Sequence, residues 1–234
     1  MKGIILAGGT GSRLYPLTKV TNKHLLPIGS FPMIHYPITS LTKAGITDIM
    51  VVTGTGHMGD MITMLGSGRE YECEFTFKVQ DQPDGIAGAL KLCKNFVGQD
   101  NCTVILGDNI FERDLTKDVQ NFDADAKLFF IEVTNSRRFG IGVFTRDALD
   151  KIEEKPKKPK SNLACVGIYI YNNIVFDAID NIKKSRRGEY EISSVNNYII
   201  KHHKCKHAIL KDSWIDAGTM DSYQATNKLI YENE

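Results

Sequence analysis

The first twelve residues contain the feature that most constrains the fold, a short apolar run that leads directly into a glycine-rich loop. The run at residues 4–6 is typical of a buried β-strand, and Gly8, Gly9 and Gly11 follow it at once. In an α/β protein, the loop that leaves the first strand lies at the carboxyl edge of the sheet, where free backbone N–H groups can hold an anion. The opening segment therefore favours an α/β fold with a phosphate-bearing ligand at this edge.

The rest of the chain fits the same fold class. Apolar runs alternate with helical patterns in the first half, and we expect strands at 3–6, 48–53, 75–80 and 103–106 and helices at 33–43, 58–65 and 85–94. From residue 127 to residue 171 the pattern changes to consecutive strands, and helices return at 190–201 and 220–231. This order predicts a Rossmann-like α/β/α sandwich around a central mixed, mainly parallel sheet.

Length and charge limit the remaining possibilities. With 234 residues, 42% of them hydrophobic, the chain can bury a large core, and we expect one domain over residues 1–234. The proline-punctuated segment EEKPKKPKSN is too short to separate two domains. A net charge of +1 gives no electrostatic reason to expect nucleic acid or an anionic membrane as a partner.

The cysteines and the N-terminus indicate a cellular location. The five cysteines are odd in number and none forms a C-x-x-C pair, which favours a reducing compartment. The apolar run before the glycines is too short for a secretory signal, and no later run approaches the length of a membrane span. We therefore expect a cytoplasmic protein.

Charge is distributed unevenly around the glycine loop. Residues 1–47 include five Lys or Arg residues and no Asp or Glu. Arg13 and Lys23 closely follow the glycines, so a polyphosphate is the ligand that this segment favours. The alternative is a tight turn with exposed cations, which the glycines alone do not exclude.

Two common phosphate loops do not match. A Walker A loop requires Gly-Lys followed by Ser or Thr, and the sequence contains no Gly-Lys pair. A dinucleotide fingerprint requires G-x-G-x-x-G and an acidic residue about 20 positions further on. Here Leu14 stands where the third glycine is needed and the first acidic residue is Asp48. Both an ATPase of the P-loop type and an NAD-dependent oxidoreductase are therefore disfavoured.

A series of sequence blocks covers nearly the whole chain. LAGGTGSRLYPLT and NKHLLPI are followed in order by VQDQPDGIAGAL, LGDNIF, RFGIGVF, IEEKPKKPKSN, RRGEYEISSVNN and WIDAGT. Together the blocks resemble the sugar-1-phosphate nucleotidyltransferases. The resemblance implies a nucleotide-binding half at about 1–125 and a sugar-phosphate-binding half at about 126–234.

The same resemblance implies an activity and its cofactor. A phosphate oxygen of glucose 1-phosphate would attack the α-phosphorus of dTTP, giving dTDP-glucose and pyrophosphate, with Mg²⁺ bound. A sugar phosphate is mostly ionised at neutral pH because its second pKa is about 6, so no general base is needed. Homo-oligomers, dimers or tetramers, are usual in this family.

The family resemblance also indicates which residues bind the nucleotide. The resemblance assigns nucleotide binding to Leu6, Gly8, Gly9, Thr10, Gly11, Ser12, Arg13, Lys23, Gln80, Gly85 and Asp108. Arg13 and Lys23 would neutralise charge on the phosphates, and Gln80 would read the O4 and N3–H edge of thymine or uracil. Asp108 and Asp216 would hold Mg²⁺ together, although either aspartate alone could instead cap a turn or helix.

The sugar side comes from the strand-rich second half. The resemblance assigns sugar-phosphate binding to Gly140, Glu154, Lys155, Cys165 and Arg187. Glu154 would accept hydrogen bonds from the hexose, and Lys155 and Arg187 would hold its phosphate. The resemblance thus gives Lys155 a catalytic role beside Arg13, Lys23 and Asp108.

Several alternatives stay open at this level. A uridylyl or cytidylyl transferase, or a thymidylyltransferase for another hexose 1-phosphate, would share fold and mechanism. A noncatalytic relative would have lost some of Arg13, Lys23, Asp108 and Asp216, and all four are present. His24 stands where the family commonly has Gln, which leaves open how strictly dTTP is preferred over UTP.

Overall fold

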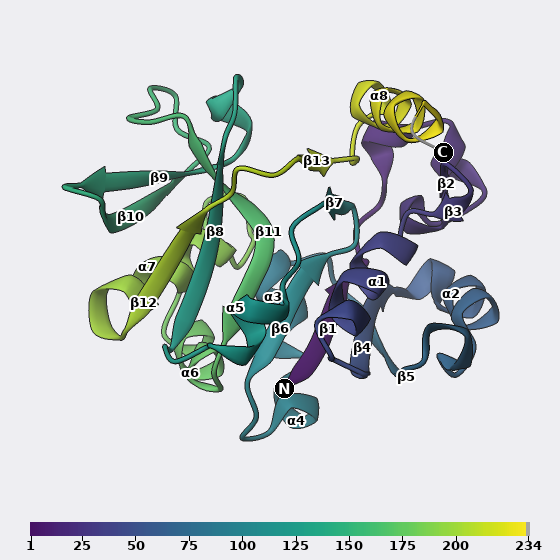
Figure 1. Ribbon diagram of the computed structural model, residues 1–234, viewed down its shortest axis with the longest axis horizontal. Helices are drawn as coiled ribbons and strands as arrows, with labels where there is room; N and C mark the ends of the chain where they lie inside the picture. Colours follow the sequence, from purple (N-terminus) through teal and green to yellow (C-terminus); the bar gives the residue numbers. More distant parts are fainter. Residues whose placement is uncertain (233–234) are drawn as a thin grey trace.

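A nine-stranded mixed sheet forms the centre of the computed structural model, which describes residues 1–232 (Figure 1). Its parallel part runs in the order β6 (Cys102–Leu106), β1 (Lys2–Leu6), β4 (Asp48–Gly54) and β5 (Glu74–Gln80). β11 (Leu163–Tyr171) pairs antiparallel with β6 and leads to the remaining strands. These are β8 (Ala126–Glu132), β9 (Gly140–Thr145), β10 (Ala148–Glu154) and β12 (Cys205–Ile209).

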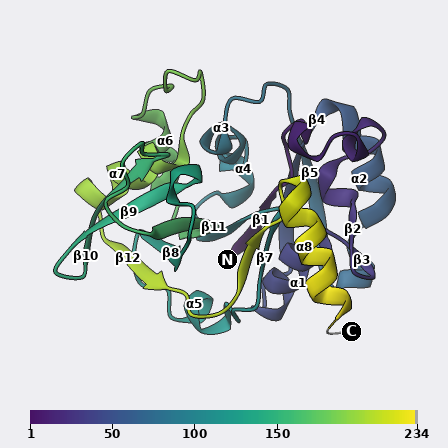
Figure 2. The ribbon, with the colours of Figure 1, turned by 90° about the horizontal axis from the view of Figure 1, so that it is seen from above.

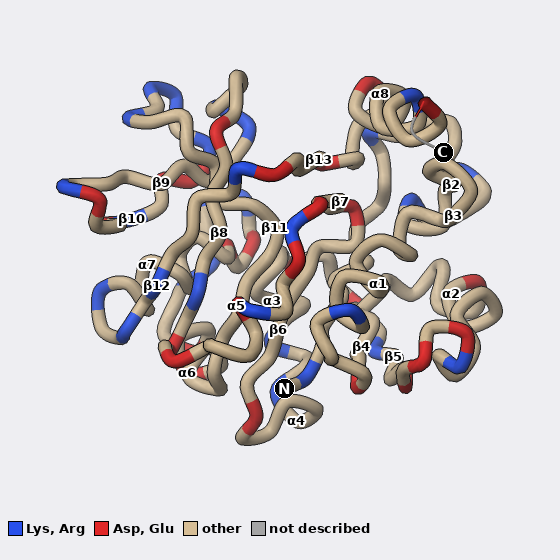
Figure 3. Tube along the Cα trace, viewed as in Figure 1, with Lys and Arg blue, Asp and Glu red and all other residues tan. Residues whose placement is uncertain are grey.

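The central strands are apolar because helices cover both of their faces. In β1, Ile4 and Leu6 face one hydrophobic cluster, while Ile5 faces the other. β6 and β11 contain no charged residue, and Figure 3 shows the charged residues on the elements and loops around them. A strand buried on both faces reads as a continuous apolar run, so the three-layer architecture explains the run that opens the chain.

Helices form the two outer layers, as Figure 2 shows. The first layer consists of α3 (Ile86–Lys91), α4 (Lys94–Val97), α6 (Ile174–Asp180) and α7 (Ile192–His202). The opposite layer consists of α1 (His35–Lys43), α2 (Met58–Leu65) and α5 (Thr116–Gln120). The predicted α/β fold is therefore confirmed.

The C-terminal helix α8 (Met220–Tyr231) lies beside the hairpin of β2 (Pro27–Ile28) and β3 (Phe31–Pro32) (Figure 1). The Tyr223 hydroxyl donates to the carbonyl of Pro27 at 2.7 Å. Thr219 caps the start of the helix in a capping box with Ser222. Segments nearly 200 residues apart in the sequence thus form one corner of the molecule.

Most predicted elements are present, and the differences have local causes. The helix expected at 85–94 is divided into α3 and α4, because Leu92 and Cys93 donate to carbonyls three residues back and tighten the turn. Sequence patterns gave no sign of α5, α6, or the three-residue strands β7 (Asn109–Phe111) and β13 (Trp214–Asp216). Within residues 1–232, no helix is both long and apolar enough to cross a membrane.

Candidate active site

One cavity of about 610 Å³ gathers nearly all of the predicted site residues. It lies beyond the carboxyl ends of β1 and β6, and its walls come from both halves of the chain. The predicted residues that line it are Leu6, Gly8, Gly9, Thr10, Arg13, Lys23, Gln80, Gly85, Asp108, Gly140, Glu154, Lys155, Cys165, Arg187 and Asp216. Gly11 and Ser12 do not line the cavity.

The glycine loop is shaped by two left-handed residues. Gly9 has φ 93° and Gly11 has φ 62°, a region that side chains disfavour. A β-carbon on Gly11 would lie 2.8 Å from Thr18, whose hydroxyl donates to the Gly11 carbonyl. Gly11 therefore shapes the loop, and Ser12 begins the 3₁₀ turn Ser12–Leu14 that carries Arg13 into the cavity wall.

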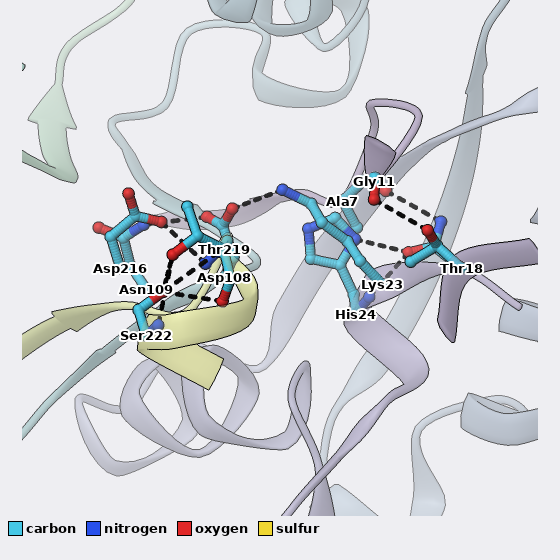
Figure 4. Close-up of polar contacts among 12 residues, drawn as sticks. Ala7, Gly11, Thr18, Lys23, His24, Asp108, Asn109, Asp216, Thr219 and Ser222 are labelled. Carbon is cyan, nitrogen blue, oxygen red and sulfur yellow. Dashed lines mark hydrogen bonds and ion pairs between the residues drawn. The ribbon is translucent and has the colours of Figure 1, made fainter. Parts of the chain in front are cut away.

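Lys23 and Asp108 form an ion pair at the base of the cavity (Figure 4). The Lys23 Nζ atom lies 2.5 Å from Asp108 Oδ2, and both side chains are almost buried. Asn109 donates from Nδ2 to Asp108 Oδ1 at 3.0 Å. Its own Oδ1 accepts from the Trp214 indole and from the Gly167 amide, so the position of Asp108 is fixed from several sides.

A two-stranded ribbon brings Asp216 to Asp108. β13 pairs antiparallel with β7, and Asp216 lies opposite Asn109 in the register. The Ala217 amide donates to the Asp108 carbonyl at 2.9 Å, and the Gly218 amide donates to Asp216 Oδ1 at 3.0 Å. Asp216 is thus the last residue of a strand that the sequence pattern did not indicate, and it lies beside Asp108 in Figure 4.

The pKa values of the two carboxylates are shifted in opposite directions. Burial alone would raise the pKa of Asp108, but the Lys23 ammonium together with the hydrogen bonds from Lys23 and Asn109 holds that pKa well below its usual value. Burial raises the pKa of Asp216, and the negative charge of Asp108 raises it further. Arg13 partly opposes this effect. A bound cation would favour the ionised form of both carboxylates.

The two carboxylates converge beside the Gly218 backbone. A β-carbon on Gly218 would lie 2.8 Å from Asp216 Oδ1 and 2.9 Å from Asp108 Oδ2, so the two oxygens lie close to each other. Mg²⁺ is typically held by one or two carboxylates together with phosphate oxygens and waters. In the described part of the chain, no group of three or more His, Cys, Asp or Glu residues could hold a metal by itself. Ligand oxygens would have to complete such a site.

Gln80 and Gly85 lie on the side of the cavity formed by β5 and α3. Gln80 is the last residue of β5, and Gly85, with φ 100°, precedes α3. A β-carbon on Gly85 would lie 2.7 Å from the Tyr190 carbonyl, so only glycine fits there. Gln80 Nε2 donates to Asp84 Oδ1 at 3.1 Å and to the Gly85 carbonyl at 3.4 Å.

The predicted sugar-phosphate residues form the other end of the cavity. A β-carbon on Gly140 would lie 3.3 Å from Glu154 Oε2, so the glycine leaves that carboxylate accessible. Lys155, which has φ 44°, places its Nζ 3.8 Å from Glu154 Oε1. Cys165 contributes a thiol whose pKa is raised by burial, so it is a neutral, weakly polar part of the wall.

Arg187 is engaged by carboxylates. Its Nη2 donates to both oxygens of Glu191, at 2.9 and 2.8 Å, and its Nε donates to Oε1 at 3.1 Å. Glu154 and Glu189 lie 3.6 and 3.5 Å from Nη2. The guanidinium is therefore held at the cavity wall in a fixed orientation.

His24 lies beneath the site and does not line the cavity. Its side chain is buried, and Nδ1 lies 2.7 Å from Asn22 Oδ1. A β-carbon on Gly107 would lie 2.6 Å from the ring, so His24 packs under the turn that carries Asp108. Burial, assisted by the Lys23 charge, lowers the pKa of His24 to about 3. The ring is neutral and supports the loop.

Several residues of the site were missed from the sequence. Further cavity-lining residues are Arg138, Phe139, Tyr169, Glu191, Ser193, Asn196 and Trp214. The Arg187–Glu191 pair gave no usable signal, because residues 187–191 precede α7 and are not helical. Asn196 gave no signal; it is buried, and its Nδ2 has no partner among the described residues.

Comparisons with known proteins agree on one family. The family model described as "Nucleotidyl transferase" matches residues 2–233. A glucose-1-phosphate thymidylyltransferase of Neisseria meningitidis is 40% identical over 229 residues, which are 95% of this chain and 80% of that protein. A low-salt glycan biosynthesis nucleotidyltransferase of Haloferax volcanii is 36% identical and covers 100% of this chain and 67% of its own.

Solved structures give the same result. A crystal structure described as a "Putative Glucose-1-Phosphate Thymidylyltransferase" from Bacillus anthracis, in complex with a sucrose, has a TM-score of 0.93 and 50% identity. It covers 98% of this chain and 94% of its own. A UDP-glucose pyrophosphorylase structure has a TM-score of 0.86 at 23% identity, and at that identity the likeness concerns the fold alone.

Proposed function

We propose a thymidylyltransferase activity for this chain on the premise that it belongs to the nucleotidyl transferase family. The substrates are dTTP and glucose 1-phosphate, and the products are dTDP-glucose and pyrophosphate. Both the Neisseria meningitidis and the Bacillus anthracis relatives carry the name of this activity and align over nearly the whole chain.

The proposed reaction exchanges one phosphorus–oxygen bond for another. A phosphate oxygen of glucose 1-phosphate forms a bond to the α-phosphorus of dTTP, and the bond from that phosphorus to the bridging oxygen of pyrophosphate breaks. The attacking oxygen is already ionised at neutral pH, so no residue has to remove a proton. The protein is left with two tasks, aligning the two substrates and neutralising their charge.

We assign the triphosphate to the glycine loop and the neighbouring cations. The backbone of Gly8, Gly9 and Thr10 lines the cavity and can donate N–H groups to phosphate oxygens. Arg13 and Lys23 supply positive charge where the leaving pyrophosphate gains negative charge. Because Lys23 is anchored by Asp108, its ammonium is positioned before the nucleotide binds.

We further propose that Asp108 and Asp216 hold Mg²⁺ together with the nucleotide phosphates. When bound, the ion would neutralise phosphate charge and help to align the reacting groups. The observations behind this proposal are the two carboxylate oxygens that lie close together beside Gly218 and the raised pKa of Asp216.

The sugar phosphate is assigned to the opposite end of the cavity. Glu154 can accept hydrogen bonds from hexose hydroxyls, and Gly140 leaves space for the ring beside it. Lys155 and Arg187 lie close to this carboxylate and supply the positive charge for the phosphate of the acceptor. The two substrates would then meet near Asp108, between the two ends.

One observation carries the proposal most directly: a single cavity joins a glycine loop, two converging carboxylates and, at its other end, Lys155 and Arg187 beside Glu154. The test is pyrophosphate release measured for dTTP, UTP, dCTP and dATP, each with several hexose 1-phosphates, with Mg²⁺ and with EDTA. We expect the highest kcat/KM for dTTP with glucose 1-phosphate and no turnover in EDTA. A higher kcat/KM for another nucleotide and sugar-phosphate pair would assign that pair as the substrates. If no pair releases pyrophosphate, the proposed activity is wrong.

Three organisational points are also proposals. We propose that residues 1–234 act as one nucleotidyltransferase domain, with its nucleotide half at about 1–125 and its sugar-phosphate half at about 126–234.

The enzyme is proposed to be a cytoplasmic homo-oligomer. Its five free cysteines suit a reducing compartment, and Val20 and Tyr15 leave 85% and 55% of their surface exposed. Light scattering after size-exclusion chromatography measures the assembly.

A further inference from the structure

The amide of Gln80 has only one orientation that its surroundings allow. Its Nε2 lies 3.1 Å from Asp84 Oδ1 and 3.4 Å from the Gly85 carbonyl. Both neighbours are oxygens that can only accept, so the nitrogen of the amide must face them. Turning the amide over would place its oxygen against a carboxylate and a carbonyl.

The oxygen of the same amide faces the cavity. A β-carbon on Gly8 would lie 3.0 Å from Gln80 Oε1, and both residues line the cavity. Glycine at position 8 therefore keeps this oxygen accessible. Among residues 1–232, no donor forms a hydrogen bond with Oε1, so the group that Gln80 presents to a ligand is an acceptor.

Asp84 is itself held in place. Its carbonyl accepts from the Tyr190 amide at 2.7 Å, and its Oδ2 lies 3.8 Å from Lys184 Nζ. The carboxylate also occupies the space that a side chain at position 88 would need, so Gly88 makes room for it. With Asp84 fixed in this way, the orientation of the Gln80 amide is fixed as well.

We propose that Asp84 is a positioning residue that sets the base specificity of the enzyme by orienting the Gln80 amide. Resting on the proposed function, this inference restricts the nucleotide to pyrimidines with a protonated N3, namely thymine and uracil. Their N3–H can donate to Gln80 Oε1. In this orientation Gln80 accepts from N3–H, while its Nε2 is engaged by Asp84 and the Gly85 carbonyl.

Cytosine fails at the same position for a definite reason. Its N3 carries a lone pair and no hydrogen, so Gln80 Oε1 would meet a second acceptor. Its 4-amino group could reach Oε1 only if the ring shifted from that position. An unmet polar group of this kind typically reduces kcat/KM by a factor of ten or more. Thymine and uracil are not distinguished by this device, since both carry N3–H.

Asp84→Asn is the informative substitution. Lys184 is a donor and keeps the oxygen of the introduced amide on its side, which turns the nitrogen of that amide toward Gln80. Only the Gly85 carbonyl, at the longer distance of 3.4 Å, then still favours the original orientation, so the Gln80 amide turns over and presents a donor to the cavity. We expect the ratio of kcat/KM for dTTP to that for dCTP to fall at least about tenfold, mainly through KM.

The matched control is Asp81→Asn, the same chemical change at an exposed position three residues away. We expect it to leave the ratio unchanged. Gln80→Met removes the amide at similar size, and in this background Asp84→Asn should have no further effect on the ratio. These two results distinguish a change in the orientation of Gln80 from a general loss of structure. A general loss of structure would lower kcat/KM for dTTP and dCTP by the same factor and leave their ratio unchanged. If Asp84→Asn does not fold, Asp84→Ser takes its place.

Calorimetric binding of dTTP and dCTP to the same variants gives a readout that needs no turnover. An unchanged dTTP-to-dCTP ratio in Asp84→Asn, in binding and in kcat/KM, would overturn the inference and leave the proposed function intact. Wild-type protein that binds dTTP selectively but releases no pyrophosphate would overturn the proposed function alone.

Discussion

The Lys23 ammonium lies 2.5 Å from a carboxylate oxygen of Asp108, although 85 residues separate the two in the sequence. Each side chain lies at the end of a segment that approaches the carboxyl edge of the sheet, and each is almost buried. The pair joins a cation proposed to act on phosphates to a carboxylate proposed to hold Mg²⁺. A substitution of either residue therefore affects both the proposed phosphate contacts and the proposed Mg²⁺ site.

Lys23→Ala is expected to lower kcat at least about 100-fold while nucleotide binding weakens much less. A positioned cation contributes about 3 kcal/mol where charge develops during the reaction, and only part of this is available to the bound substrate. Steady-state kinetics and calorimetric dTTP binding measure the two effects. Lys19→Ala, at an exposed lysine four residues earlier, is the control. An unchanged kcat would contradict the role given to Lys23.

Asp216→Asn is expected to raise the Mg²⁺ concentration needed for half-maximal rate by at least about tenfold. The loss of even an orienting partner commonly costs 10-fold to 100-fold in metal affinity, so the loss of a ligand should cost no less. The rate is measured as Mg²⁺ is titrated. Asp212→Asn, at an exposed position near the same strand, should behave as the wild type. A Mg²⁺ requirement that does not change would remove Asp216 from the proposed site.

His24→Gln is expected to reduce the fall in the free energy of unfolding between pH 7 and pH 5. The pKa of His24 is about 3 in the folded protein and 6.5 ordinarily, so unfolding takes up a proton as the pH falls from 6.5 towards 3. The stability from this group is complete above pH 6.5, and about 2 kcal/mol of it is lost at pH 5.

Urea unfolding at pH 7 and pH 5 measures this difference. Gln has no titratable proton, so the variant should lose less stability than the wild type between the two pH values. His202→Gln, at an exposed site near the end of α7, should retain the wild-type slope. Equal slopes for wild type and His24→Gln would show that His24 is not the group responsible.

Asp118→Asn is expected to destabilise the fold by about 3 kcal/mol at pH 7. The Asp118 carboxylate is buried and accepts from Arg113 at 2.8 Å and from Lys127 at 2.7 Å. Burial opposes ionisation, but these two cations lower the pKa below its ordinary value of 3.8. The stabilisation is therefore present above pH 4 and is lost as the pH falls through the folded pKa.

The difference between wild type and Asp118→Asn should consequently shrink below pH 4. Denaturant midpoints at pH 7, 5 and 3 test this, with Asp81→Asn as the exposed control. A difference that stays constant over this range would exclude the ion pairs as its cause.

The fold could be predicted where periodicity was strong. The helices at Met58–Leu65 and Met220–Tyr231 begin and end as their patterns predict. β7 and β13 could not be found, because three-residue strands carry no period and exist only through pairing between segments about 105 residues apart. Their pairing, rather than any local signal, places Asp216 beside Asp108.

The candidate site was predictable to a different extent on its two sides. Arg13 and Lys23 stood out because the surrounding segment lacks acidic residues, whereas the sugar-side residues came only from the family resemblance. The direction of the Gln80 amide could not be read from the sequence, since it depends on which atoms Asp84 and Gly85 present. The same is true of Arg187, because its contact with Glu191 depends on the irregular backbone between the two residues.

The ribbon of β7 and β13 also sets when a newly made chain acquires its second carboxylate. Asp108 and the glycine loop leave the ribosome early, but Asp216 can pair with Asn109 only after more than a hundred further residues have been translated. A nascent chain that has not reached this point would possess the phosphate loop and only one of the two aspartates. Activity would therefore begin late in synthesis, when β13 pairs with β7.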